Sequence, residues 1–310
     1  MKVLITGGCG FIGSNLAQKL SKENVEIVLL DNLSRSDQSN LAPDLAESLI
    51  IADVCDKAQL KNHFNGIDVV IHLAAQGSVV ESVVSPEDNY DVNATGTFNV
   101  LKVSKDAGIK NFIFASTGGA LVGDASPPVN ESSTPRPISP YGASKLAGEG
   151  YCCAFANAYD MNICALRFAN ITGPLSFHKK GAVTKFFKSL SLGKNLCLYG
   201  DGTSTRDYLD VRDLCEGIIM TMNSNLKGFN VFHLASGIET SIHELANLCI
   251  DISGVNESNI IFESKRAGEV ERNFADTSLI KETLGWEPKI SLDQSLRDTW
   301  QWMQPRLRDM

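Results

Sequence analysis

A tyrosine and a lysine stand four residues apart in the segment Ser139-Pro-Tyr-Gly-Ala-Ser-Lys145. This spacing places Tyr141 and Lys145 on one face of a helix. A phenol has an ordinary pKa near ~10 and is a poor base at neutral pH, but a neighbouring cation stabilises its phenolate. We therefore predict that Tyr141 transfers a proton and that Lys145 lowers the pKa of Tyr141. Taken alone, the pair is also typical of an ordinary amphipathic helix.

Two hydroxyls follow one another at the end of the apolar run that begins at Asn111. Ligands of open α/β sheets bind at the carboxyl ends of the strands, so either Ser116 or Thr117 could bond the reacting oxygen or relay its proton. Capping of the strand end explains Ser116 equally well. Both residues are catalytic candidates, and the sequence does not choose between them.

Three glycines with the spacing GxxGxxG follow the first apolar run, Val3–Ile5. They are Gly7, Gly10 and Gly13. Glycines there let the backbone approach a pyrophosphate and let helix and strand pack closely. A strand-to-helix turn alone often needs glycine, but Asp31 ends the next strand, where a carboxylate accepts hydrogen bonds from ribose hydroxyls, and Asp53 ends the third. We predict bound NAD because Asp31 would repel the 2′-phosphate of NADP, although Arg35 nearby leaves NADP open.

Buried apolar runs alternate with helical patterns through the first half of the chain. Strands are expected at Val3–Ile5, Val25–Leu30, Leu49–Ile51, Val69–Ala75, Asn111–Ser116, Asn162–Arg167 and Val231–Ala235. Helices are expected at about 11–22, Asp91–Asp106, Pro140–Asp160, Val183–Leu192, Asp213–Met222, Thr240–Ser253 and Leu292–Met303. This rhythm predicts an α/β fold, a Rossmann-type doubly wound parallel sheet, with a smaller α/β C-terminal substrate domain. We expect residues 1–166, joined by 208–235, to form the NAD-binding domain, and 167–207 with 236–310 to form the second.

Composition narrows the classes of partner. The chain has 310 residues, a formal net charge of -8 and no strongly basic stretch, which argues against nucleic acid. Its eight cysteines include no CxxC pair, as in proteins of a reducing compartment. No apolar run approaches the ~18 residues of a membrane span. We expect a cytoplasmic protein without a metal site, nucleic-acid partner or membrane partner.

Together these segments resemble the extended short-chain dehydrogenase/reductase family, and within it the NAD-dependent nucleotide-sugar epimerases and dehydratases. The motifs that carry the resemblance are Thr6–Gly13, Asp31-Asn32, His72–Ala75, Asn93–Asn99, Ser139–Lys145, Arg167–Asn170, Tyr199–Tyr208, Arg266–Val270 and Leu284–Pro288. They span nearly the whole chain. Singly none is specific, but collectively they are.

The resemblance implies the residues of two binding sites. The cofactor site comprises Gly7, Gly10, Phe11, Ile12, Gly13, Asp31, Asn32, Asp53, Val54, Leu73, Ala74, Ala75, Tyr141 and Lys145. The site for a nucleotide-diphosphate sugar, most simply a UDP-sugar, comprises Asn93, Asn170, Tyr199, Arg206, Tyr208, Arg266, Glu269 and Asn273.

Within the second set the resemblance implies distinct roles. Asn170, Arg206 and Arg266 match diphosphate-binding positions, and guanidinium groups suit phosphate oxygens. Tyr199 matches a base-stacking position. Asn93 falls near the sugar, and Asn273 falls where the family admits or excludes N-acetylated sugars. An ion pair with Asp207 or Asp210 is the alternative for Arg206. The resemblance also implies a homodimer through the helices at Asn93–Lys105 and Tyr141–Tyr159.

The residues after Thr117 bear on the reaction. The 4,6-dehydratases of the family carry an acidic residue there, whereas this chain has Gly118-Gly119-Ala120. We therefore expect epimerisation at C4 through a 4-keto sugar; a dehydratase, reductase or decarboxylase of the same family is the alternative. A non-catalytic NAD-sensing protein ranks last because Tyr141 and Lys145 are both present. Two departures from the family pattern, Val122 for tyrosine and Ala94 after Asn93, remove no catalytic group.

Overall fold

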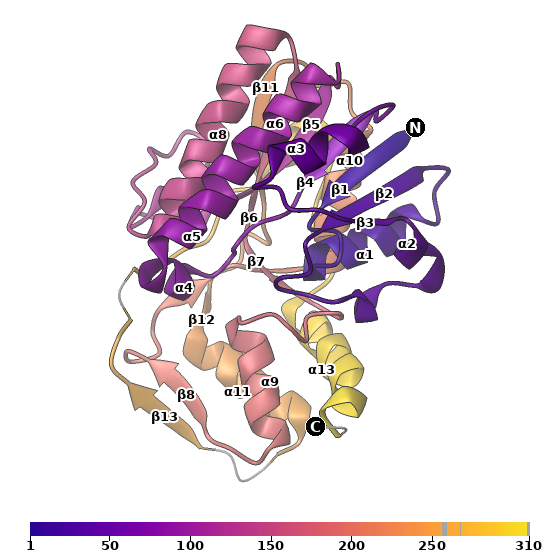
Figure 1. Cartoon of the computed structure of the whole chain (residues 1–310). Helices are drawn as coiled ribbons and strands as arrows, with labels where there is room; N and C mark the ends of the chain where they lie inside the picture. Colours follow the sequence, from indigo (N-terminus) through magenta and orange to yellow (C-terminus); the bar gives the residue numbers. More distant parts are fainter. Residues whose placement is uncertain (256–258, 267, 309–310) are drawn as a thin grey trace.

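Seven parallel strands form the central sheet of the computed structural model, which describes residues 1–255, 259–266 and 268–308 (Figure 1). The strand order is β11-β6-β5-β4-β1-β2-β3. The strands are β1 (Lys2–Thr6), β2 (Glu26–Asp31), β3 (Leu49–Ile51), β4 (Val69–His72), β5 (Asn111–Thr117), β6 (Asn162–Phe168) and β11 (Phe229–Leu234). The predicted Rossmann-type fold is confirmed, and the order reverses beside β1, where such sheets bind ligands.

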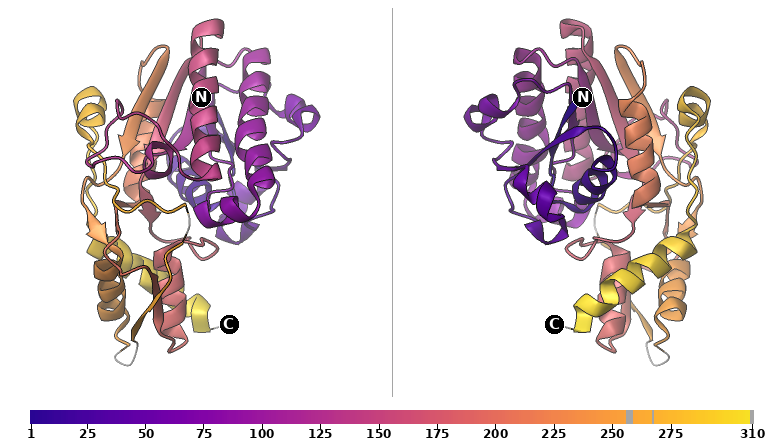
Figure 2. Two further views of the ribbon diagram at one scale, coloured as in Figure 1. Left: turned by 90° about the vertical axis from the view of Figure 1, so that its left-hand side faces the viewer. Right: turned by 90° about the vertical axis from the view of Figure 1, so that its right-hand side faces the viewer.

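Helices cover both faces of this sheet (Figure 2). On one face lie α1 (Phe11–Leu20), α2 (Pro43–Glu47), α10 (Val211–Met222) and α12 (Ser278–Leu284). On the other lie α3 (Lys57–Leu60), α6 (Gly96–Asp106) and α8 (Pro140–Tyr159). Each face encloses its own apolar core, which explains why the strands read as nearly continuous hydrophobic runs.

Helix α8 has clear sequence signals at both ends. The Ser139 side chain accepts a hydrogen bond from the Gly142 amide at 3.2 Å, and Pro140 occupies the first turn. The helix ends at Asp160, which has a left-handed φ of 52°. These ends fix where Tyr141 and Lys145 stand along the sheet.

A smaller part lies below the carboxyl ends of the strands in Figure 1. Its helices are α9 (Ala182–Ser191), α11 (Ile242–Ser253) and α13 (Leu292–Arg308), around a third apolar core. Its short strands pair as β13 (Ile260–Glu263) with β8 (Leu196–Tyr199), β12 (Thr240–Ser241) with β9 (Thr205–Arg206), and β10 (Tyr208–Asp210) with β7 (Asn170–Thr172).

The remaining elements surround the carboxyl edge or the periphery of the sheet. They are η1 (Gln38–Asn40), η2 (Lys61–His63), α4 (Val79–Val84), α5 (Pro86–Tyr90), the π-helical η3 (Asp91–Thr95) and α7 (Gly119–Val122). Several predicted boundaries are wrong, including that of the last helix, which continues past Met303 to Arg308. The fourth strand ends at His72, because the chain then turns so that the Leu73 amide can bond the Thr6 carbonyl at 3.1 Å. The helix expected from Thr240 begins at Ile242, because Thr240 and Ser241 pair with β9.

Candidate active site

The turn between β1 and α1 is too tight for side chains. Gly7 has φ +70°, and a Cβ on it would lie 2.8 Å from the Ala74 amide nitrogen. A Cβ on Gly13 would lie 2.2 Å from the Gly7 carbonyl oxygen. The turn therefore packs on itself and on the segment after β4, and it presents bare backbone at the start of a helix. That is the geometry a pyrophosphate requires.

Asp31 is held against this turn. Its Oδ2 accepts a hydrogen bond from the Cys9 amide at 3.0 Å, and its Oδ1 accepts one from the Leu33 amide at 2.8 Å. Burial raises the pKa of Asp31, although these bonds act in the opposite direction. Asn32 donates to Asp53 at 2.9 Å. The residues predicted for the adenosine half of the cofactor thus converge at the ends of β2 and β3.

The other predicted cofactor residues lie around the same edge. Phe11 and Ile12 open α1, and Leu73, Ala74 and Ala75 follow β4; all five are half-buried. The side chain of Val54 is buried in the core, so only its backbone faces the site. Arg35 pairs with Glu81 at 2.8 Å. Sequence reasoning missed Lys179, whose ammonium lies 5.2 Å from the Phe11 ring centroid and bonds the Ile171 carbonyl.

Tyr141 lies beside Thr117 and not beside Ser116. The Tyr141 and Thr117 side chains share a hydrogen bond. The Ser116 hydroxyl instead donates to the Glu149 carboxylate at 2.6 Å. Lys145 is 2% exposed and donates to the Ala115 carbonyl at 2.7 Å. Of the two hydroxyls, only that of Thr117 is placed to share a proton with Tyr141.

In the protein chain alone the pKa of Tyr141 is not lowered, and the predicted lowering, which also needs the positive charge of the nicotinamide, stays a prediction. Burial raises the pKa of Tyr141 to about 12, and the bond with Thr117 offsets only part of this effect. Burial also lowers the pKa of Lys145 to about 8, against the attraction of Cys152 and Glu149. The sequence showed the spacing of the phenol and the ammonium but not how thoroughly the fold removes water from them.

Asn93 is a correction to the predicted substrate site. It is fully buried in the π-helical turn η3, and its amide is used internally. Its Nδ2 donates to the Gln76 carbonyl and the Ser144 hydroxyl, both at 3.1 Å, and its Oδ1 accepts from the Gln76 amide at 2.8 Å. Asn93 therefore braces the first turns of α8.

The two predicted phosphate-binding arginines come from different segments of the smaller part. Arg206 donates to the Thr205 carbonyl at 2.7 Å. The alternative of an ion pair with Asp207 or Asp210 is wrong, since Asp207 accepts from the 236–237 turn and Asp210 pairs with Arg212 at 2.8 Å. The guanidinium of Arg206 is half-buried and available to an anion.

Arg266 stacks on Tyr199, with its guanidinium carbon 3.2 Å from the ring centroid. It also lies 3.9 Å from Glu269. This arrangement occupies the ring face that the sequence assigned to a nucleotide base. Asn170 is exposed and donates to the Asp207 carbonyl at 3.3 Å. Ala267, part of the quoted motif, lies outside the described residues.

Tyr208 and Asn273 are both buried. Tyr208 is 7% exposed and belongs to the third apolar core. The charges of Arg206 and Glu269 both act on the Tyr208 hydroxyl, and a role for Tyr208 in substrate binding stays a prediction. Asn273 packs against Gly119, on which a Cβ would lie 2.8 Å from the Asn273 side chain. Its Nδ2 has no hydrogen-bond partner among the described residues. An unpaired buried donor beside the glycines suits a polar group of a ligand.

Sequence reasoning also missed a buried polar group behind the catalytic pair. Arg167 forms a two-pronged ion pair with Glu149, with Nε–Oε1 at 3.0 Å and Nη2–Oε2 at 2.9 Å. His233, the next-to-last residue of β11, lies beside Gly118, and burial lowers its pKa to about 4. The signal for Glu149 was present in the sequence, because it stands one further helical turn beyond Tyr141 and Lys145.

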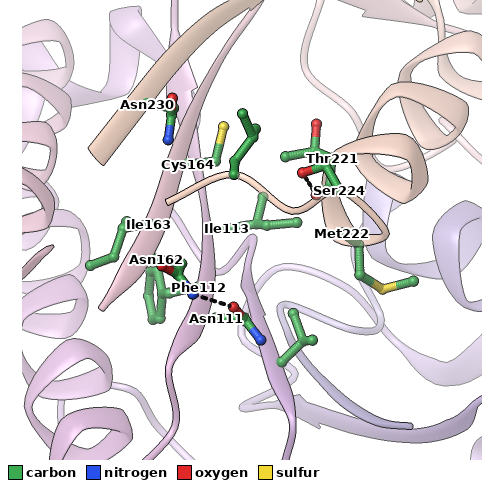
Figure 3. Close-up of a pocket in the computed structure, with 12 residues that line it drawn as sticks. Asn111, Phe112, Ile113, Asn162, Ile163, Cys164, Thr221, Met222, Ser224 and Asn230 are labelled. Carbon is green, nitrogen blue, oxygen red and sulfur yellow. Dashed lines mark hydrogen bonds between the residues drawn. The ribbon is translucent and has the colours of Figure 1, made fainter. Parts of the chain in front are cut away.

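A pocket at the other end of the sheet carries no candidate chemistry (Figure 3). It has a volume of about 30 Å³ and is lined in part by Asn111 and Asn162, the first residues of β5 and β6. Their side chains bond each other at 3.0 Å. Nucleotide sites are roughly ten times larger, and they lie at the opposite edge.

Neither a metal-binding cluster nor a membrane-spanning helix occurs among the described residues. No three or more histidine, cysteine, aspartate or glutamate side chains are grouped so that they could hold a metal ion. Within the same residues, no helix has both the length and the apolar character needed to cross a bilayer.

A parallel sheet with a glycine turn beside a buried tyrosine–lysine pair defines a dinucleotide-binding protein of the short-chain dehydrogenase/reductase type. Residues 3–235 match the NAD dependent epimerase/dehydratase family, and the chain belongs to that family. The bare backbone of the turn and the buried Asp31 carboxylate fit the NAD that this family uses.

Similar proteins cover almost the whole chain. A UDP-glucose 4-epimerase of Mycolicibacterium smegmatis is 32% identical over 96% of this chain and 97% of its own length. The structure of a Thermotoga maritima UDP-glucose 4-epimerase with UDP-glucose has a TM-score of 0.94 at 34% identity, covering 99% of this chain and 100% of that one. A dTDP-glucose 4,6-dehydratase of Streptomyces venezuelae with NAD bound has a TM-score of 0.93 at 29% identity, covering 98% and 97%. The fold alone therefore does not separate the two reactions.

Proposed function

We propose that this protein interconverts nucleotide-activated sugars that differ in configuration at C4, such as UDP-glucose and UDP-galactose or their N-acetylated equivalents. One observation carries the proposal: Tyr141, bonded to Thr117 and one turn from the buried Lys145, stands beside two glycines with no acidic group after Thr117. Such a site can move a proton to and from a hydroxyl. It lacks the acid that elimination of water requires.

Tyr141 is the base in this mechanism. NAD⁺, when bound, supplies the acceptor for the C4 hydride and a positive charge near the phenol. Tyr141 takes the proton of the 4-hydroxyl, with Thr117 as the hydroxyl that aligns or relays it. Lys145 stabilises the phenolate. The 4-keto sugar then turns, and Tyr141 returns the proton after hydride is restored to the other face of C4. Gly118 and Gly119 let His233 and Asn273 approach the backbone next to Thr117, since a Cβ on either glycine would lie 3.0 or 2.8 Å from those side chains.

The smaller part holds the nucleotide while the sugar turns. Arg206 has no carboxylate partner among the residues described here and is free to clamp a phosphate oxygen. Arg266 is the second cation, and it must leave or share the Tyr199 ring when a nucleotide base enters. Charge-assisted bonds from two guanidiniums anchor a diphosphate without fixing the sugar beyond it.

The choice of sugar is assigned to Asn273. Its unpaired amide and its contact with Gly119 place a polar group of intermediate size at the wall of the site. We infer that both plain and N-acetylated sugars fit. A dehydratase, reductase or decarboxylase activity remains the second candidate because a dehydratase shares the fold at 29% identity.

The test is a panel of UDP-, dTDP-, GDP- and CDP-sugars incubated with the purified protein. Product stereochemistry is followed by NMR, and free NADH is followed by absorbance. An epimerase yields the C4 epimer of one or more substrates to equilibrium, with no net NADH. Net NADH, release of CO₂ or a deoxy-keto product would instead establish the second candidate.

We further propose a homodimer that packs α6 and α8 against their copies. Tyr151 and Tyr159 on α8 are 45% and 44% exposed, and Tyr151 stacks edge-on against Phe98 of α6 at 5.2 Å. Exposed aromatic clusters are typical of interfaces. Light scattering of the purified protein tests the oligomeric state.

We also infer that residues 1–166 with 208–235 hold NAD, and that residues 167–207 with 236–310 hold the nucleotide sugar. We infer as well that the protein is cytoplasmic.

A further inference from the structure

The end of β5 is tied to α8 at three successive residues. Ala115 accepts from Lys145 at 2.7 Å, Ser116 donates to Glu149 at 2.6 Å, and Thr117 bonds Tyr141. The three partners on α8 are one helical turn apart. Two of these contacts belong to the proposed chemistry. The third does not, because Glu149 has a side-chain exposure of 7% and touches no open part of the site.

Both oxygens of Glu149 are occupied from the sheet side. Oε1 accepts from Ser116 and from Arg167 Nε, and Oε2 accepts from Arg167 Nη2. Ser116 and Arg167 are neighbours in the register of β5 and β6. One buried carboxylate thus joins α8 to two adjacent strands, directly behind the residues that meet the ligand.

We propose that Glu149 is a positioning residue for the reaction: its carboxylate fixes the end of β5 against α8 and sets a negative charge one helical turn from the Lys145 ammonium. The inference rests on the proposed function for its kinetic consequences. Its electrostatic part stands on the chain alone. An ion pair that served only stability would be equally well replaced by apolar side chains.

Several titratable groups surround Lys145. On α8 it faces Glu149 and Cys152, on β4 His72, and beyond Glu149 lies Arg167 of β6. His72 is neutral near pH 7 because burial lowers its pKa to about 3, and Cys152 stays a thiol because burial raises its pKa. Among these groups Glu149 alone offers Lys145 a negative charge.

Loss of the Glu149 charge changes the pKa of Lys145 in a defined direction. The ammonium of Lys145 becomes less favourable, so its pKa falls further below the ordinary value. The state with a Tyr141 phenolate and a Lys145 ammonium becomes less populated relative to the state with a Tyr141 phenol and a Lys145 amine. The reason is that Glu149 lies one helical turn from Lys145 and two turns from Tyr141. Proton transfer slows at every pH, and the alkaline limb of the kcat profile, where Lys145 loses its proton, moves to lower pH.

The experiment compares Glu149→Gln with the wild-type protein and with Asp213→Asn as a matched control. Asp213 is also a buried carboxylate, but it lies in α10 on the other face of the sheet and accepts from the Lys289 and Ile290 amides, both at 2.8 Å. We expect Glu149→Gln to lower kcat about 10- to 100-fold, the scale on which misplaced reacting groups act, with KM unchanged. Asp213→Asn should lower Tm alone.

A second readout does not depend on substrate. Titration of the Lys145 side chain by NMR of selectively labelled protein, assigned with Lys145→Met, should give a lower pKa in Glu149→Gln than in wild type. If Glu149→Gln does not fold, the pair Glu149→Leu with Arg167→Met replaces both charges by apolar groups and should show a smaller shift in the same direction, because the positive charge of Arg167 is removed together with the negative charge of Glu149.

An unchanged Lys145 titration together with an unchanged kcat, accompanied only by a lower Tm, would overturn the proposal. A second outcome is that Glu149→Gln lowers the Lys145 pKa while the wild-type protein epimerises none of the sugars tested. That outcome would contradict the proposed function and leave the electrostatic role of Glu149 in place.

Discussion

Acidification should destabilise this protein well above the pH at which its carboxylates protonate, because two imidazoles are buried in the neutral form. His72 is 1% exposed and lies between the hydroxyls of Thr6 and Thr97, at 2.7 and 3.0 Å. Burial, helped by the charge of Lys145, lowers the pKa of His72 from 6.5 to about 3. Burial likewise lowers the pKa of His233 to about 4.

The direction and the size of this pH effect on the free energy of unfolding follow from the linkage between proton binding and folding. Between these folded values and pH 6.5 the unfolded chain binds a proton that the folded chain does not, so stability falls as the pH falls. Each imidazole contributes a slope of about 1.4 kcal/mol per pH unit in this window, or about 2 kcal/mol between pH 6.5 and about pH 5. Asp31 and Asp207, whose pKa values burial raises, act in the opposite sense at lower pH.

The assay is urea unfolding at half-unit steps of pH for wild type, His72→Gln and His243→Gln. His243 is exposed on α11 and serves as the control. Removal of His72 should about halve the slope of the free energy of unfolding against pH, and removal of His243 should leave it unchanged. A wild-type stability that is flat across the window, or a full slope in His72→Gln, would refute the reasoning.

Three further predictions test other parts of the account. Gly13→Ala, whose Cβ would lie 2.2 Å from the Gly7 carbonyl, should weaken NAD binding at least about tenfold, as measured by calorimetry. Arg206→Met should raise KM for the nucleotide sugar by about 10- to 100-fold, matching the loss of one charge-assisted phosphate bond, whereas Arg297→Met, which breaks an ion pair on α13, should not. Asp207→Asn leaves the amides of the 236–237 turn without a charged acceptor and should lower the free energy of unfolding by about 2 kcal/mol, with unchanged stability counting against it.

The long elements could be predicted because their local patterns and their tertiary environment agree. Continuous apolar runs identified all seven strands of the main sheet, including β11, which joins it after 60 intervening residues. Pro140 and Ser139 marked the start of α8 to the residue. The short strands β7, β8, β9, β10, β12 and β13 were missed, since each pairs with a distant segment and has no pattern of its own.

For the candidate site, the sequence predicted which residue types take part more reliably than where their side chains point. Asn93 and Ser116 are polar residues in site motifs, but their side chains are bonded inside the protein, and a sequence does not show which way a polar side chain points. The effect of burial on Tyr141 is hidden from the sequence in the same way. The position of Lys145 is visible in the sequence, whereas the burial that raises the pKa of Tyr141 arises only on folding.

The most direct test of the central claim is the turnover of Tyr141→Phe, with Tyr90→Phe as control because Tyr90 is 61% exposed on α5. The account predicts that Tyr141→Phe binds NAD as wild type does and that its C4 interconversion of the sugar falls by about 10²- to 10⁴-fold, while Tyr90→Phe keeps full activity. Undiminished interconversion by Tyr141→Phe would contradict the assignment of this phenol as the base.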